Sequence, residues 1–104
     1  MNYTENYKGI KLDVQSVNLD ISDSEQAEIR SAIDKISRFA NVINAVDVYF
    51  KHEGSGNDVT HVVGMRVGVP GPDVFAEEKG IEEHWKVLLK SVTDKVIRQL
   101  QKSK

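Results

Sequence analysis

The chain has 104 residues and a formal net charge of −2, with 39% hydrophobic and 29% charged residues, as expected of one soluble domain with a single core. It contains no cysteine, which excludes disulfides, thiolate metal sites and cysteine nucleophiles. No segment approaches the ~20 apolar residues of a membrane span and no signal-peptide pattern opens the chain, so we expect a cytoplasmic protein.

The N-terminal part predicts a polar segment, a strand and a helix. Residues 1–9 are polar without periodicity and are interpreted as a tail or as an addition to a sheet edge. Over residues 10–17 apolar and polar residues alternate, which is typical of a half-buried strand. Ser22 and Glu25 form a capping-box pattern. Apolar residues follow at helical spacing, so a helix is expected over 23–41.

Three further strands are predicted over residues 45–53, 59–69 and 74–79. Residues 54–58 are glycine-rich and indicate a turn, as does the Pro-Gly-Pro-Asp sequence at 70–73. In the second of these strands, Arg66 lies between Gly64 and Gly68 on one face, so no neighbouring side chain on that strand covers it. Gly80 is expected to break the chain before the last helix.

The final segment, residues 84–104, predicts an amphipathic helix. Its apolar stripe comprises Trp85, Leu88, Leu89, Val92, Val96 and Leu100. The margins are basic: Lys86 and Lys90 on one side, and Lys95, Arg98 and Lys102 on the other. Residues 84–104 carry six basic and one acidic side chain, net +5, so the rest of the chain carries −7. Such a helix should attract a polyanion, although lysines can also flank a stripe for solubility and to cover apolar surface.

The element order β-α-β-β-β-α predicts an α+β fold. It packs most simply as one four-stranded, mostly antiparallel sheet with both helices on one face. We therefore expect a tail over residues 1–9 and one domain over residues 10–104.

The residues favour a protein that is not an enzyme. The three histidines, His52, His61 and His84, are scattered and lack the spacing of a metal site. No pattern indicates a nucleophile, a phosphate loop or paired catalytic carboxylates. We expect no catalytic residue, no cofactor, no metal and no small-molecule substrate.

Several segments resemble the family of ribosome hibernation promoting factor and ribosome-associated inhibitor A, also called sigma-54 modulation proteins. Residues 34–39 and 43–53 are similar to the end of helix one and the second strand of the family. Residues 69–77 resemble a hairpin in which a Pro-Gly-x-Asp turn precedes Leu-Phe-Ala. Trp85 opening the last helix and the Asp-Lys-x-x-Arg-Gln-Leu-x-Lys-x-Lys pattern at 94–104 complete the resemblance.

The resemblance implies a small stationary-phase or stress-response protein with a fold like a double-stranded-RNA-binding domain. Such a protein would bind rRNA of the small ribosomal subunit at the decoding channel and sterically block mRNA and tRNA. It would resemble the short form of the family and be monomeric when free. The residues carried over as rRNA-phosphate contacts are Lys35, Lys95, Arg98, Lys102 and Lys104, and charge geometry adds Arg38, Arg66, Lys86 and Lys90.

Two features keep other interpretations open. Family members often carry acids where this chain has Lys86 and Lys90. A protein-interaction or regulatory module is the alternative function. It would use an open sheet face carrying Tyr49, Val62 and Arg66, or add a partner strand to the sheet edge.

Overall fold

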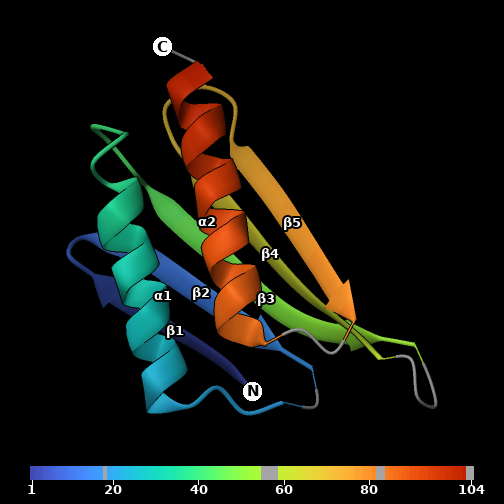
Figure 1. The fold of residues 1–104 in the computed structure, drawn as a ribbon. Coiled ribbons are helices and arrows are strands. Elements are labelled where there is room, and N and C mark those ends of the chain that lie inside the picture. The colour runs from blue at the N-terminus through green and yellow to red at the C-terminus, as the bar shows by residue number, and fades with distance from the viewer. Residues whose placement is uncertain (18, 55–58, 82–83, 103–104) are drawn as a thin grey trace.

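The computed structural model describes residues 1–17, 19–54, 59–81 and 84–102. It is an α+β fold in which five strands form one mixed sheet, in the order β1-β2-β3-β4-β5 (Figure 1). The β2 and β3 strands pair in parallel, and the other three neighbouring pairs are antiparallel. In chain order the elements are β1 (Asn2–Tyr7), β2 (Ile10–Ser16), α1 (Asp23–Ile36), β3 (Ala45–Glu53), β4 (Thr60–Gly68), β5 (Val74–Ile81) and α2 (Trp85–Lys102).

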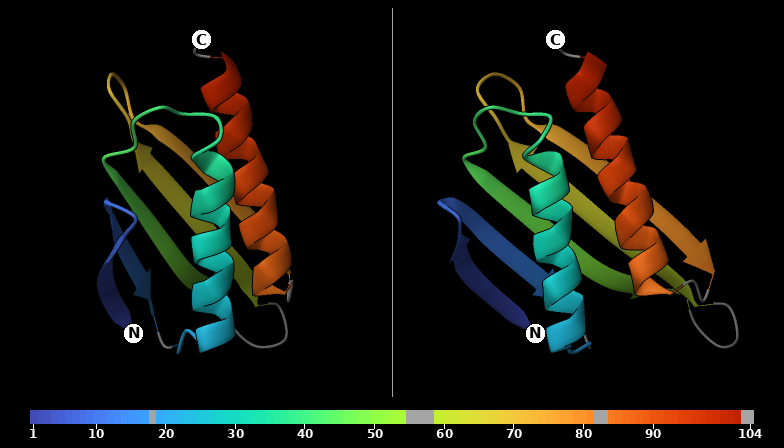
Figure 2. Two further views of the ribbon diagram at one scale, coloured as in Figure 1. Left: turned by 90° about the vertical axis from the view of Figure 1, so that its left-hand side faces the viewer. Right: turned by 60° about the vertical axis from the view of Figure 1, so that its left-hand side comes forward.

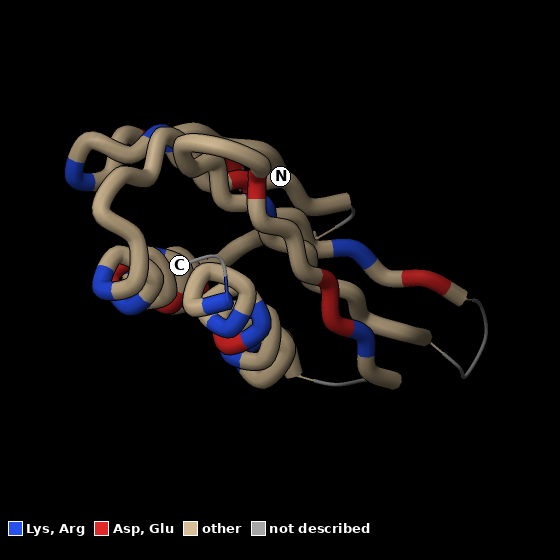
Figure 3. The backbone as a smooth tube through the Cα atoms, turned by 90° about the horizontal axis from the view of Figure 1, so that it is seen from above, with Lys and Arg blue, Asp and Glu red and all other residues tan. Residues whose placement is uncertain are grey.

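Both helices cover the same face of the sheet, as predicted, and the opposite face is open (Figures 2 and 3). The parallel β2–β3 pair explains why α1 lies there, because a parallel connection must cross over the sheet. Alternate strand residues and one stripe of each helix fill the layer between them. Trp85 opens α2 and packs edge-on against Phe50, with the ring centroids 5.8 Å apart. It also stacks on His61, with the centroids 4.2 Å apart, which confirms its predicted role as the anchor of this helix.

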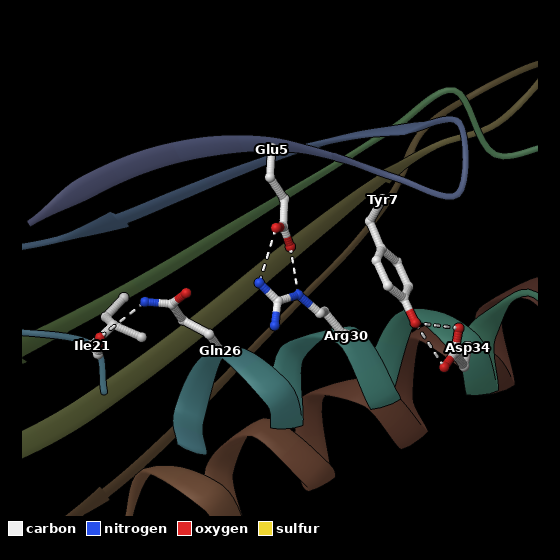
Figure 4. Close-up of polar contacts among 6 residues, drawn as sticks. All are labelled: Glu5, Tyr7, Ile21, Gln26, Arg30 and Asp34. Carbon is white, nitrogen blue, oxygen red and sulfur yellow. Dashed lines mark hydrogen bonds and ion pairs between the residues drawn. The ribbon is translucent and has the colours of Figure 1, made fainter. Parts of the chain in front are cut away.

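The predicted four-stranded sheet is wrong in one respect, because residues 2–7 form a fifth strand: of the two interpretations of residues 1–9, the tail is wrong and the addition to a sheet edge is confirmed. This β1 strand pairs antiparallel with β2 at the sheet edge. On its inner side, Glu5 Oε1 and Oε2 accept hydrogen bonds from Arg30 at 2.8 and 3.0 Å. The Tyr7 hydroxyl donates to the Asp34 carboxylate at 2.9 Å (Figure 4). The strand is therefore joined to α1 by polar contacts, which hydrophobic alternation cannot reveal.

The predicted start of α1 is confirmed, and its predicted end is wrong. The Ser22 hydroxyl accepts from the Glu25 backbone N–H at 3.1 Å, and the Glu25 side chain accepts from the Ser22 N–H, which completes the capping box. The helix ends at Ile36 instead of residue 41. At its end the Ile33 carbonyl accepts from both the Ser37 hydroxyl and the Ser37 backbone N–H, each at 2.9 Å. The next N–H groups donate three residues back, in tighter turns.

The second half follows the predicted strands with longer or shorter ends. The β5 strand continues through Gly80, which pairs with His61 of β4, so the prediction that Gly80 breaks the chain is wrong. Gly71 has φ of 96°, a conformation that suits glycine in the predicted turn before β5. In the predicted turn at 54–58, residues 55–58 lie outside the described part of the chain, as do residues 103–104, which were predicted to belong to the last helix. Within the described residues, no helix has the length and apolar character to cross a membrane.

Candidate RNA-binding face

The exposed side of α2 carries basic residues spaced four apart. Residues at this spacing lie next to each other along a helix surface, so they form one oblique row. Within α2 only Asp94 is acidic. The row therefore presents positive charge over most of the helix length. Its members are Lys86, Lys90, Asp94, Arg98 and Lys102.

Two of the predicted lysines pair with acids across the gap between the helices. Lys35 Nζ lies 3.1 Å from Asp94 Oδ1, and Lys86 Nζ lies 3.9 Å from Glu28 Oε1. All four side chains are between 42% and 48% exposed. Ion pairs this exposed stabilise a protein by only about 0–1 kcal/mol. Both lysines can therefore exchange their carboxylate for another anion at little cost.

Four further cations on or next to the helices have no acidic partner in the described part of the chain, unlike Arg30 and Lys95, which pair with Glu5 and Glu78. Lys90 and Lys102 are exposed on α2, and Arg38 is exposed just beyond α1. Among the residues that the structure describes, Arg98 donates to one backbone carbonyl, that of Asp94, at 3.4 Å and to no carboxylate. We call Lys90, Arg98 and Lys102 the basic ridge. Its charges are available to a ligand without breaking an ion pair.

A groove of about 370 Å³ lies between α1 and α2. The two helices run side by side in both views of Figure 2. Small side chains on α1, Ser31 and Ala32, leave the space open where Leu89 and Thr93 of α2 face them. Lysines line it from both helices. The lining comprises Glu28, Ser31, Ala32, Lys35, Lys86, Val87, Leu89, Lys90 and Thr93.

Two predicted RNA contacts lie elsewhere. Lys95 faces β5, where its Nζ is 3.0 Å from Glu78 Oε2 and donates to the Glu77 carbonyl at 3.4 Å. The Ser91 hydroxyl, which donates to Glu78 at 2.7 Å, and the Lys95 ammonium together lower the pKa of the Glu78 carboxyl. Arg66 projects from the opposite face of the sheet, as its position between Gly64 and Gly68 predicts. Lys104 lies outside the described residues.

The open sheet face differs in character from the helix face. Its acids (Asp13, Asp47, Glu53 and Glu77) are matched by its bases (Lys11, Lys51, Arg66 and Lys79). Arg66 lies over the Phe75 ring, 5.4 Å from the centroid, and pairs with Asp73 at 3.9 Å. Val62 is fully buried here, so the expectation that it lies on an available surface is wrong.

Tyr49 lies across the centre of the open face. Its ring covers Gly64, where any larger side chain would collide with it. Its hydroxyl donates to the Glu77 carboxylate on the far side of β4. Burial and the neighbouring Glu77 charge raise the pKa of Tyr49 to about 12. The aromatic ring is thus used to bridge three strands of the sheet.

The edge of the sheet at β5 is partly covered by α2. Gln99 Nε2 donates to the Phe75 carbonyl at 2.8 Å, and Lys95 donates to the Glu77 carbonyl. These carbonyls are therefore already bonded, which disfavours addition of a partner strand at this edge.

Sequence reasoning identified Lys35 of α1 but missed the rest of the α1 face that lines the groove. Glu28, Ser31 and Lys35 recur at intervals of three and four, the spacing of one helix face, which was the available signal. It went unused because only the tertiary structure shows that this face lies opposite α2. Among the described residues, no three His, Asp or Glu side chains gather as a metal site would require.

Comparison with known proteins identifies the family. A sequence model described as "Sigma 54 modulation protein / S30EA ribosomal protein" matches residues 12–104. No curated protein matches the chain by sequence. A solved structure, the N-terminal domain of Protein Y from Thermus thermophilus, is similar with a TM-score of 0.75 at 17% identity, over 91% of this chain and 98% of that one. A ribosomal subunit interface protein from Coxiella burnetii is similar with a TM-score of 0.69 at 17% identity, over 88% and 94% of the two chains. These structures share the fold, and the match over 12–104 shows that the chain belongs to the sigma 54 modulation protein / S30EA ribosomal protein family.

Proposed function

We propose that the protein binds rRNA of the small ribosomal subunit at the decoding channel and sterically blocks mRNA and tRNA. It would act in the cytoplasm as a hibernation factor during stress or stationary phase, as a monomer when free. The family is one of ribosome-associated modulators and not of enzymes, which agrees with the prediction from sequence. The observation that carries the proposal is the basic ridge, because its three cations have no acidic partner among the described residues.

The chemistry of the ridge suits a phosphate backbone. Lysine and arginine that neutralise phosphates release the counterions condensed on the nucleic acid, and this release drives binding. Arg98 can offer a planar fork of donors to a phosphate, whereas Lys90 and Lys102 act as point charges. Contacts of this kind position a protein without reading sequence. A rigid α+β domain held in a channel by such contacts would act by occlusion and needs no chemical step.

The distribution of charge supports an orientation in which the helices face the RNA. The net charge of −2 does not oppose RNA binding, because α2 carries five bases and one acid while the charges on the open sheet face balance. Within the helix layer, α2 is thus the electropositive element, since α1 carries four acids and two bases. It would steer toward RNA, leaving the neutral sheet face outward. A fold like a double-stranded-RNA-binding domain, which the sequence resemblance implies, is part of the same proposal.

Co-sedimentation with purified ribosomal subunits tests the proposal. We expect the protein to pellet with the small subunit at low salt and to inhibit a translation assay when added in excess. The variant Lys90→Ala/Arg98→Ala/Lys102→Ala should lose most of both activities, while the fold is kept because all three side chains are exposed. A wild-type protein that stays in the supernatant at low salt would rule the proposal out.

The matched control removes the same number of positive charges, three, from the open sheet face. Lys11→Ala/Lys51→Ala/Lys79→Ala removes three cations from the open sheet face and should sediment as the wild type does. If this variant alone loses binding, the contact lies on the sheet. Ribonuclease treatment distinguishes RNA binding from the alternative function, a protein-interaction module. An RNA-dependent association would vanish, and a protein contact would survive.

A further inference from the structure

We infer that the groove between α1 and α2 seats one unstacked nucleotide of the bound RNA, with its base on the groove floor and its phosphates on the lysine rim. This inference rests on the proposed function and narrows it, because it names the form of RNA that the helix layer recognises. A nucleotide inside a duplex has its base stacked and paired. The partner is therefore a single-stranded or looped segment.

The two cross-helix ion pairs set the length of the nucleotide-binding part of the groove, which we call the seat. Both helices run in the same direction (Figure 1), so Glu28 with Lys86 closes one end and Lys35 with Asp94 closes the other. The pairs are separated by seven residues on α1 and eight on α2, or about 10–12 Å at 1.5 Å per residue. That length admits one base and its sugar. An amphipathic partner helix, which needs several turns of continuous apolar groove, would not fit between them.

The floor of the groove is apolar, and a bound base would need no hydrogen bond to it. Ala32 and Leu89 are largely buried, and the Thr93 hydroxyl already donates to the Leu89 carbonyl at 2.7 Å. A base can lay its flat face on such a surface whatever its identity, because the contact uses no hydrogen bond. The seat would therefore bind any of the four bases.

The rim selects an anion. Three lysines, Lys35, Lys86 and Lys90, line the groove against two acids, Glu28 in the lining and Asp94 at one end. Lys90 has no acidic partner among the described residues, so it offers a first phosphate contact. Lys35 and Lys86 follow by exchanging a half-exposed carboxylate for phosphate, since such pairs contribute only about 0–1 kcal/mol. Apolar floor and cationic rim together match a nucleotide and not an apolar peptide.

Filling the groove tests the seat without removing a charge. Ser31 is exposed and lines the groove, so Ser31→Phe should fold and place a ring where the base would lie. The matched control is Thr4→Phe, which adds the same ring at an exposed position of β1 on the other side of the sheet. The probe is hexauridylate, with binding followed by fluorescence anisotropy at low salt. We expect Ser31→Phe to bind about tenfold more weakly, equivalent to about 1.4 kcal/mol, and Thr4→Phe to bind as the wild type does.

A second measurement needs no variant. The wild-type protein should bind hexauridylate about tenfold more tightly than an abasic ribose-phosphate oligomer of the same length, and more tightly than a short RNA duplex. Equal binding of the abasic oligomer, or of Ser31→Phe and the wild type, would overturn the nucleotide seat. In that case salt-sensitive binding to ribosomal subunits would still uphold the proposed function, whereas absence of that binding would remove both.

Discussion

The Lys35 ammonium at the end of α1 lies 3.1 Å from the carboxylate of Asp94, the one acid of α2. The contact joins residues 59 positions apart in the chain. It neutralises the acid that would otherwise interrupt the row of cations along α2. The exposed face of α2 is thereby more uniformly positive than its sequence suggests, although the charge of Lys35 is used in this pair.

Removing the acids of the cross-helix pairs should strengthen RNA binding. In Glu28→Gln/Asp94→Asn, Lys86 and Lys35 no longer exchange a carboxylate for phosphate, and the negative potential at the groove falls. Because each pair contributes about 0–1 kcal/mol, we expect the affinity for the small subunit to rise by about two- to fivefold for each acid replaced. Filter binding at fixed salt measures the change.

The control for this prediction is Glu53→Gln, which removes an acid from the open sheet face, where Glu53 pairs with Lys51 and Lys79. Its affinity for the subunit should stay at the wild-type value. A rise in Glu53→Gln equal to that in the double variant would mean that only overall charge matters. No change in either variant would mean that Lys35 and Lys86 do not touch RNA.

Binding should depend steeply on salt, and the ridge should set the slope. On single strands each phosphate contact contributes about 0.7 to the slope of log affinity against log salt. Losing Lys90, Arg98 and Lys102 should reduce that slope by about 2. A titration from low to moderate salt with the wild type and the ridge variant measures it. Parallel lines for the two proteins would place the phosphate contacts on other residues.

Gly64→Ala should destabilise the fold. A methyl group at this position would collide with the Tyr49 ring and displace its hydroxyl from Glu77. Overpacking of this kind costs about 1–3 kcal/mol of unfolding free energy, measurable by urea denaturation. Ribosome binding by the folded fraction should be unchanged, since Tyr49 lies on the face away from the helices.

Gly68→Ala is the matched control on the same strand. Its added methyl group would meet no atom closer than 3.6 Å. The change should be neutral or should stabilise by about 0.4–1 kcal/mol, because alanine restricts the unfolded chain. If both glycine variants lose the same stability, the Tyr49 ring is not the cause.

The Glu5 to Arg30 ion pair predicts part of the acid sensitivity of the fold. The Arg30 hydrogen bond holds the pKa of the Glu5 carboxyl below its usual value of 4.5. A lowered folded pKa gives stability that is present above pH 4.5 and is lost as the pH falls through the folded value. Glu5→Gln should therefore be less stable than the wild type at pH 7. The two should converge in strong acid, as followed by thermal unfolding across pH.

The double variant Glu5→Gln/Arg30→Gln completes a double-mutant cycle for the Glu5–Arg30 ion pair. In an Arg30→Gln background, Glu5→Gln should cost little at any pH, because its partner is already gone. An undiminished cost there would show that Glu5 stabilises β1 by another contact.

Local patterns in the sequence were enough for the elements that contact the core. The stripe of α2 was predicted and is confirmed: Leu88, Leu89, Val92, Val96 and Leu100 are buried, and Trp85 packs against them. Helical spacing predicts such burial because side chains three and four apart share a face. The bounds of β3 are likewise as predicted, since its apolar and polar residues alternate. The cations of α2 could be recognised for the same reason.

The chain by itself therefore determined the buried stripe of α2, the alternation of β3 and where the positive charge of α2 lies, because these follow from side chains adjacent along one element. Only the tertiary structure decided what depends on contacts distant in sequence. The β1 strand has little apolar alternation and is held by Arg30 and Asp34, 25 and 27 residues away. Gly80 stays in a strand because β4 supplies its partner. The groove and its two ion pairs exist because the fold lays α1 beside α2, and neither helix encodes that neighbour in its own sequence.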